Sequence, residues 1–201
     1  IMLISLSRVY LGVHFLTDVL AGWLLGGLIL WIFLRWEGPV DSWLDRQSTR
    51  VQILVAFLAS MVMIFFGFLG RSVLHTWEIS RLWRENMLYH TGHAADPLDA
   101  DTVLLIAGVF FGLGAGTAWL SRRWDYEEGG ILRQRAGRYI VGMCGLLLIW
   151  CGLDALLPTG KTPIAYLARY LQSGLIGVWV SAGAPFLSFH LDQQLPDWLF
   201  S

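Results

Sequence analysis

Long apolar runs separated by short polar segments organise the chain. A helix rises about 1.5 Å per residue, so about 20 apolar residues cross the roughly 30 Å of hydrocarbon in a membrane. Five runs reach or approach that length, over residues 9–34, 51–70, 102–120, 139–157 and 166–190. Residues 1–6 are expected to form the tail of an earlier helix. The pattern therefore predicts an all-α fold, a polytopic transmembrane helix bundle with about five spans.

Tryptophan and glycine refine this picture. Tryptophans flank several runs, as in the aromatic belts at lipid–water boundaries, and they include Trp31, Trp36, Trp119, Trp124 and Trp198. The third run carries Gly108, Gly112 and Gly116 at a spacing of four. Small residues on one helix face allow two backbones to approach closely. We therefore expect this face to pack tightly against a neighbouring helix.

Composition agrees with a membrane protein and excludes one class of partner. Hydrophobic residues make up 56% of the chain and charged residues 14%, whereas soluble domains carry about 25% charged residues. The net charge of −1 provides no basic excess, so no nucleic-acid partner is expected. Cys144 and Cys151 lie about 10 Å apart along one predicted helix, too far for a disulfide.

The distribution of basic residues predicts the orientation in the membrane. Residues 35–50 hold three arginines and residues 121–138 hold five, whereas the loops on the other side hold Arg71, Arg81, Arg84 and Lys161. Basic loops favour the cytoplasmic side. The start of the first run is then expected to face outward, which in a bacterial inner membrane is the periplasm.

Polar and titratable residues stand at the start of the first run: Ser7, Arg8, His14 and Asp18. On one continuous helix, His14 and Asp18 would share a face one turn apart. A carboxylate that accepts from one imidazole nitrogen fixes the tautomer and makes the other nitrogen a better nucleophile. A guanidinium matches the oxygens of a phosphate. The set suits attack on a phosphoryl group carried by a lipid. A structural interpretation stays open, with a capping Ser, a snorkelling Arg and an interfacial His–Asp pair.

The spacing Ser7-Arg8-x5-His14-x3-Asp18, within "VYLGVHFLTDVLAG", resembles the third signature motif of the type 2 phosphatidic acid phosphatase superfamily. The resemblance implies that His14 attacks phosphorus and becomes a phosphohistidine, that Asp18 orients it, and that Arg8 and Ser7 bind the phosphate. It implies no metal and no other cofactor. The expected activity is hydrolysis of a lipid phosphate or pyrophosphate, with undecaprenyl pyrophosphate, phosphatidic acid and phosphatidylglycerol phosphate all open as substrates.

Two motifs of this family that should precede the third, Lys-x6-Arg-Pro and Pro-Ser-Gly-His, do not occur in the chain. We therefore expect the chain to be the C-terminal portion of a longer phosphatase, whose missing N-terminal part completes the site. Residues 1–36 would end the catalytic domain, and residues 37–201 would form a four-span membrane extension. Alone, the chain would lack the general acid for turnover. The alternative is a non-catalytic membrane scaffold or a degenerate phosphatase relative.

Two further polar groups receive structural interpretations. Residues 71–101 contain His90, His93 and Asp96, but their spacing matches no strong zinc pattern, and a solvated loop with a short interfacial helix is favoured over a metal site. Such a loop could cover a lipid headgroup. Asp154, inside the fourth run, is expected to pair with Arg169 or to reach the interface.

Overall fold

The computed structural model describes residues 2–10, 15–74, 85, 88–89, 99–123, 132–158 and 160–194. Within this part of the chain, helices and short connections form the whole structure, and no strand occurs. The chain divides into two compact units, Ile1–Ser48 and Thr49–Ser201, and each is described by itself. The predicted all-α fold is confirmed.

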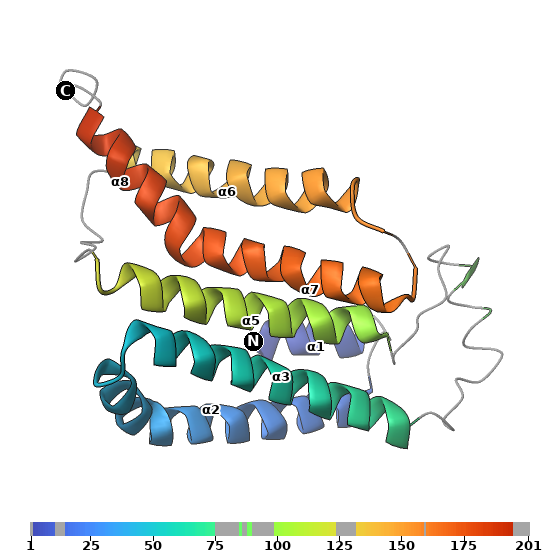
Figure 1. Cartoon of the computed structure of the whole chain (residues 1–201). Coiled ribbons are helices and arrows are strands. Elements are labelled where there is room, and N and C mark those ends of the chain that lie inside the picture. The colour runs from blue at the N-terminus through green and yellow to red at the C-terminus, as the bar shows by residue number, and fades with distance from the viewer. Residues whose placement is uncertain are drawn as a thin grey trace. The chain divides into compact units, whose positions relative to one another are not determined.

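The first unit contains α1 (Met2–Tyr10) and α2 (Leu16–Asp45) (Figure 1). The prediction of one helix over residues 9–34 is wrong at both ends, because α1 ends at Tyr10 and α2 continues to Asp45. Pro39 lies inside α2 and provides no N–H for the helix ladder. Prolines are tolerated in membrane helices when nearby groups compensate. The last turns of α2 run in a different direction from the rest, as expected for a proline kink (Figure 1).

The second unit contains the remaining described helices: α3 (Thr49–Val73), α5 (Ala100–Leu120), α6 (Leu132–Asp154), α7 (Pro163–Val178), the π-helix η1 (Trp179–Gly183) and α8 (Ala184–Gln194). Four helices of the described chain, α2, α3, α5 and α6, are long and apolar enough to cross a membrane. The fifth predicted run forms α7, η1 and α8, which follow one another without a gap. The chain is therefore a multi-pass membrane protein.

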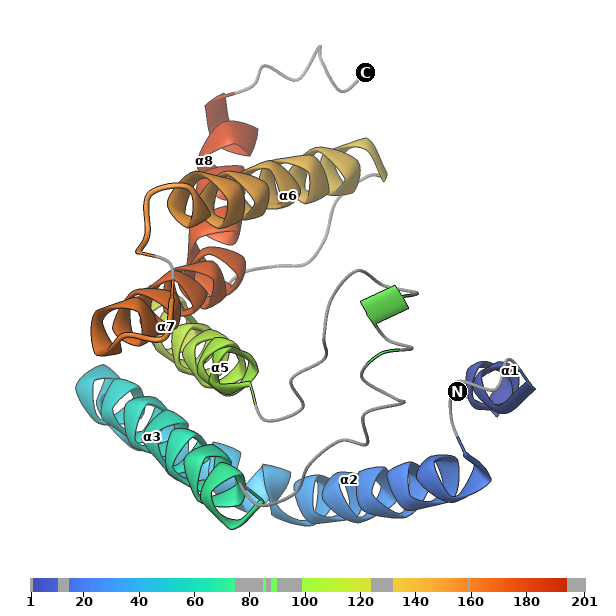
Figure 2. The same cartoon turned by 90° about the vertical axis from the view of Figure 1, so that its right-hand side faces the viewer.

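Helix α5 lies at the centre of the second unit, with α7 along one side and α3 along the other (Figure 2). The buried side chains of Leu104, Ala107 and Tyr170 form its core. The hydroxyl oxygens of Ser60 and Tyr170 lie 2.7 Å apart, and the Ser60 hydroxyl also donates to the carbonyl of Phe57 at 2.7 Å. A buried hydrogen bond therefore joins α3 to α7 beside the central helix.

The glycine stripe of α5 brings its backbone against α7, as predicted. A Cβ atom on Gly112 would lie 2.0 Å from the carbonyl oxygen of Gly174, and one on Gly177 would lie 2.4 Å from the carbonyl oxygen of Val109. The Ser181 hydroxyl donates to the carbonyl of Gly177 at 2.9 Å. Because these neighbours are backbone atoms, the two helices can reach this separation only with glycine at the contact.

Helix α6 is joined to this core through the π-helix. The Trp179 indole N–H donates to the carbonyl of Gly142 in α6 at 3.0 Å. The same ring lies on Gly145, where a Cβ atom would come within 2.1 Å of it. The turn before α7 is also well defined, since the Thr162 hydroxyl accepts from the Ala165 N–H at 3.2 Å. Trp179 therefore connects the π-helix to the middle of α6.

Candidate functional site

Asp18 occupies the first turn of α2. Phe15 precedes the helix with extended backbone angles, and its N–H donates to Asp18 Oδ2 at 2.9 Å. This bond satisfies a backbone donor that the start of a helix would otherwise leave without a partner. A carboxylate at this position is also favoured by the positive end of the helix dipole. Asp18 is therefore fixed in place at the entrance to α2.

Ser7 and Arg8 belong to α1, the helix that precedes this entrance. The Ser7 hydroxyl donates to the carbonyl of Ile4, one turn back, at 2.8 Å. A serine in a helix commonly makes this bond, and the hydroxyl oxygen keeps acceptor capacity beyond it. Helix α1 ends at Tyr10, so Ser7 and Arg8 lie in its last turn or just before it. Both residues thus stand next to the connection that leads to α2.

A side-chain hydrogen bond joins the two helices of this unit. The Trp23 indole N–H in α2 donates to the Ser5 hydroxyl in α1 at 3.1 Å. Apolar side chains from both helices line a cavity of about 330 Å³ beside it, among them Leu6, Val9 and Leu20. The α1 segment that carries Ser7 is therefore tied to the helix that carries Asp18. No sequence rule pairs residues 18 positions apart, so the motif itself did not point to Trp23 or Ser5.

The structure does not bring the whole predicted set together within its described part. His14 and the side chain of Arg8 lie outside the described residues. One premise of the prediction is corrected: α2 begins at Leu16, so Asp18 lies within the helix and His14 precedes it. Because Phe15 has extended backbone angles, no continuous helix leads into Asp18, and the shared helix face that was expected for the two residues is not supported. Their contact, and the phosphate-binding role of Arg8, stay predictions.

A second polar cluster lies in the other unit, where Arg169 in α7 forms an ion pair with Asp101 in the first turn of α5. Of the two alternatives for Asp154, the pairing with Arg169 is not seen, and the exposed position of Asp154 at the end of α6 leaves the interface as the other alternative. The close packing of α5 on α7 places Asp101 against the guanidinium, and this packing could not be read from sequence distance. Asp154 still lines the same cavity as Arg169.

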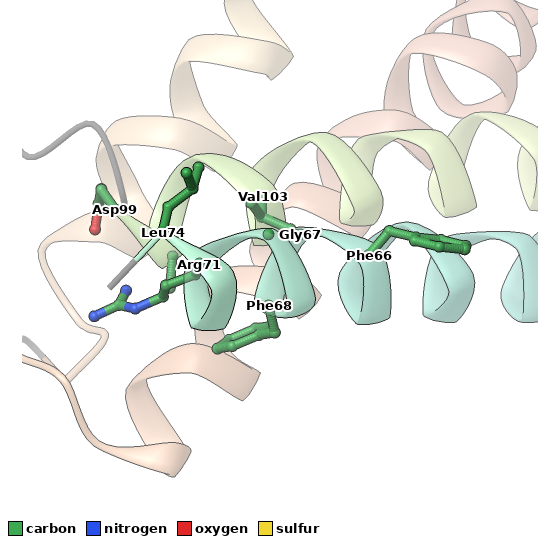
Figure 3. Close-up of a pocket in the computed structure, with 9 residues that line it drawn as sticks. Phe66, Gly67, Phe68, Arg71, Leu74, Asp99 and Val103 are labelled. Atoms are coloured by element: carbon green, nitrogen blue, oxygen red, sulfur yellow. The ribbon is translucent and has the colours of Figure 1, made fainter. Parts of the chain in front are cut away.

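A third candidate is a cavity of about 220 Å³ between the end of α3 and the start of α5. Figure 3 shows Gly67 facing Val103 at its inner end, with the charged side chains of Arg71 and Asp99 at the outer end. Its walls are mainly apolar, and its two charged residues are of opposite sign. This cavity is a surface recess, and its described lining does not combine a nucleophile with a general acid or base.

From the sequence, we considered a metal site in the loop between α3 and α5. Across the residues that the structure describes, no group of three or more His, Cys, Asp or Glu side chains could hold a metal ion. His90, His93 and Asp96 lie outside the described residues, as does most of the predicted interfacial helix. These interpretations stay predictions.

Comparison with known families assigns the chain. The model described as PAP2 superfamily matches residues 1–41, which contain the whole Ser7-Arg8-x5-His14-x3-Asp18 motif. The model described as PAP2 superfamily phosphatase, transmembrane extension, matches residues 104–194, from α5 to the end of α8. Searches among curated proteins and among solved structures gave no match. The motif at one end and the helical extension at the other identify the chain as a member of the PAP2 superfamily of membrane phosphatases.

Proposed function

We propose that this chain, together with an N-terminal part that supplies the earlier motifs, forms a lipid phosphatase that acts through a phosphohistidine. The observation that carries the proposal is the match of residues 1–41 to the superfamily, a range that contains the motif with His14. The substrate is a lipid phosphate or pyrophosphate, because the motif stands at the start of α2, a helix able to cross a membrane.

The proposed reaction has two displacements. An imidazole nitrogen of His14 attacks phosphorus, a P–N bond forms, and the bond to the leaving oxygen breaks. That oxygen takes a proton, which the resemblance assigns to the histidine of the Pro-Ser-Gly-His motif. Water then attacks phosphorus, the P–N bond breaks, and inorganic phosphate leaves with the imidazole restored. The guanidinium of Arg8 stabilises the charge on the phosphate oxygens, so the residues of the motif require no metal.

The described part of the site supports two of these roles. Asp18 is held at the N-terminus of α2 by the Phe15 N–H, and the positive end of a helix dipole favours a bound phosphate nearby. The Trp23–Ser5 hydrogen bond keeps the α1 segment with Ser7 and Arg8 beside the same helix. One hydrogen bond on either side of residues 11–14 therefore holds a described part of the proposed site.

A trapping experiment tests the intermediate. The full-length protein is mixed with a lipid phosphate labelled with ³²P and quenched in alkali, which preserves phosphohistidine, and labelled peptides are identified by mass spectrometry. We expect label on His14, lost on brief acid treatment. Vanadate should inhibit, since it resembles the trigonal-bipyramidal transition state. Label on another residue, or turnover unaffected by saturating vanadate, would contradict the mechanism. A protein without turnover on any lipid phosphate would favour the scaffold alternative.

The proposed location is the periplasmic face of a bacterial inner membrane. In a variant without Cys144 and Cys151, single cysteines at Gln47 and Lys161 probe the two ends of the spans. A membrane-impermeant maleimide added to intact cells should label Lys161→Cys and spare Gln47→Cys, because the arginine-rich loops favour the cytoplasm. The reverse labelling would place the site on the cytoplasmic side.

A further inference from the structure

A cavity with three charged side chains in its lining lies where the ends of α5, α6 and α7 meet. Its volume is about 330 Å³, within the range of small-ligand sites. Polar and aromatic side chains from all three helices line it: Asp101, Thr102, Trp150, Asp154, Arg169 and Gln172. We propose that this cavity binds the phosphoethanolamine headgroup of a membrane lipid, with its ammonium at Asp154 and its phosphate at Arg169.

The charges in the cavity favour a ligand with a cationic end. Arg169 is already paired with Asp101, so the carboxylate of Asp154 leaves the lining with a net negative charge. Asp154 has no hydrogen bond or ion pair with any residue that the structure describes. Oδ1 of Asp101 is also buried, with no hydrogen-bond partner in the same part of the chain. A primary ammonium, with three N–H donors, matches such carboxylate oxygens.

One neutral polar side chain of the lining joins two of the helices. The Gln172 amide donates to the carbonyl of Trp150 at 3.0 Å and so joins α7 to α6. The Ser173 hydroxyl donates to the carbonyl of Arg169 at 2.7 Å. The Gln172 bond connects two walls of the cavity and the Ser173 bond lies within α7, so neither bond uses the carboxylate of Asp154 or the guanidinium of Arg169. The Trp150 ring adds an aromatic surface of the kind that attracts ammonium groups.

Arg169 provides the complementary group for the phosphate. Its ion pair with Asp101 is formed by Nη1, and a guanidinium has five N–H donors in a planar fork. The remaining donors are suited to phosphate oxygens. A zwitterionic headgroup thus satisfies the carboxylate and the guanidinium at once, whereas a simple anion or a simple amine would satisfy only one of them.

The place of the cavity in the fold favours a lipid over a soluble compound. Helix α5 begins at Ala100, α6 ends at Asp154 and α7 begins at Pro163, so the charged residues lie near the ends of membrane helices, where headgroups reside. Leu105 and Ile176 line the cavity farther along the helices and provide apolar contact for the adjoining acyl chains. These residues are distinct from those of the phosphatase proposal, so the two proposals can fail separately.

Lipid retention in native mass spectrometry tests this proposal on the full chain. The purified protein is exchanged into mixed micelles with equal amounts of phosphatidylethanolamine, phosphatidylcholine and phosphatidylglycerol. We expect phosphatidylethanolamine to be retained about tenfold over the other two, since a charge-assisted hydrogen bond contributes roughly that factor. Phosphatidylcholine lacks the N–H donors, and phosphatidylglycerol lacks the cation. If the unmodified chain retained the three lipids equally, that result alone would overturn the proposal.

Two matched variants locate the site. Asp154→Asn keeps the side-chain shape and removes the charge, and it should reduce phosphatidylethanolamine retention to the level of the other lipids. Asp45→Asn, at the end of α2, makes the same change outside the cavity lining and should leave the preference intact. Full preference in Asp154→Asn, with a melting temperature close to that of the unmodified chain, would show that the lipid binds elsewhere.

Discussion

The indole N–H of Trp23 in α2 donates to the hydroxyl of Ser5 in α1, with 3.1 Å between Nε1 and Oγ. This bond connects the helices on either side of residues 11–14, which precede α2 and include His14. Ser7 and Arg8 lie within one turn of Ser5 on α1, and Asp18 lies in the first turn of α2. The bond therefore constrains the distance between the two halves of the phosphatase motif.

Removal of this bond should reduce activity without unfolding the protein. Trp23→Phe keeps an aromatic ring in the α1–α2 cavity and deletes the N–H donor. We expect kcat/KM for lipid phosphate hydrolysis by the full-length protein to fall about fivefold, since a net hydrogen bond contributes about 1 kcal/mol. Trp31→Phe, farther along α2 on its exposed surface, is the matched control and should change little. Equal rates for both variants would show that the Trp23–Ser5 bond does not position the site.

Two substitutions of Asp18 separate its structural role from its proposed catalytic one. Asp18→Asn retains an oxygen that can accept from the Phe15 N–H, whereas Asp18→Ala removes it. We expect only Asp18→Ala to lower the free energy of unfolding, by about 1 kcal/mol, because a cap is lost. Both should lower kcat at least a hundredfold, because neither carries the charge that stabilises an imidazolium. A near-normal kcat in Asp18→Asn would show that Asp18 acts only as a helix cap.

The α5–α7 contact should tolerate no added methyl group. In Gly112→Ala the new Cβ would meet the Gly174 carbonyl oxygen, a backbone atom that cannot turn aside. We expect the free energy of unfolding in detergent to fall by about 1–3 kcal/mol, the usual range for overpacking. Gly152→Ala is the control, since a Cβ there meets nothing within 4 Å, and it should be neutral or stabilising. Thermal denaturation followed by circular dichroism distinguishes the two, and equal stability would refute the close contact.

The buried bond between Ser60 and Tyr170 should be measurable as a coupling between α3 and α7. Ser60→Ala, Tyr170→Phe and the double variant form a double-mutant cycle. We expect a coupling free energy of about 0.6–2 kcal/mol, the range for interhelical hydrogen bonds in membrane proteins. If the effects of the two single substitutions on the free energy of unfolding were strictly additive, the two hydroxyls would not be bonded in the membrane.

The apolar runs were sufficient to predict the helices, because a helix able to cross a membrane leaves a long signal in the sequence. The glycine stripe of α5 was also readable, since small residues at a spacing of four mark one face. The start of α2 at Leu16 was not readable, because Phe15 is as apolar as its neighbours and the cap is formed by its backbone with Asp18. The π-helix at Trp179 likewise has no simple sequence signal.

The candidate site was predicted from its motif and only partly located by the structure. Asp18 and Ser7 have defined positions, while the contact between His14 and Asp18 stays a prediction. The ion pair of Arg169 with Asp101 was missed, because pairing depends on which helices pack together. The sequence suggested Asp154 as one partner for Arg169, whereas the fold places Asp101, in the first turn of α5, against its guanidinium.

The most direct measurement of the central claim is the hydrolysis rate of His14→Asn in the full-length protein. Phosphate release from a lipid phosphate in mixed micelles is followed for this variant and for His190→Asn, a control whose imidazole Nδ1 lies 3.0 Å from the Phe186 carbonyl oxygen in α8. We predict that His14→Asn reduces kcat to background, with normal expression and melting temperature, because the nucleophile is gone. His190→Asn should keep most of the activity. Turnover by His14→Asn within tenfold of the unmodified protein would contradict covalent catalysis by this histidine.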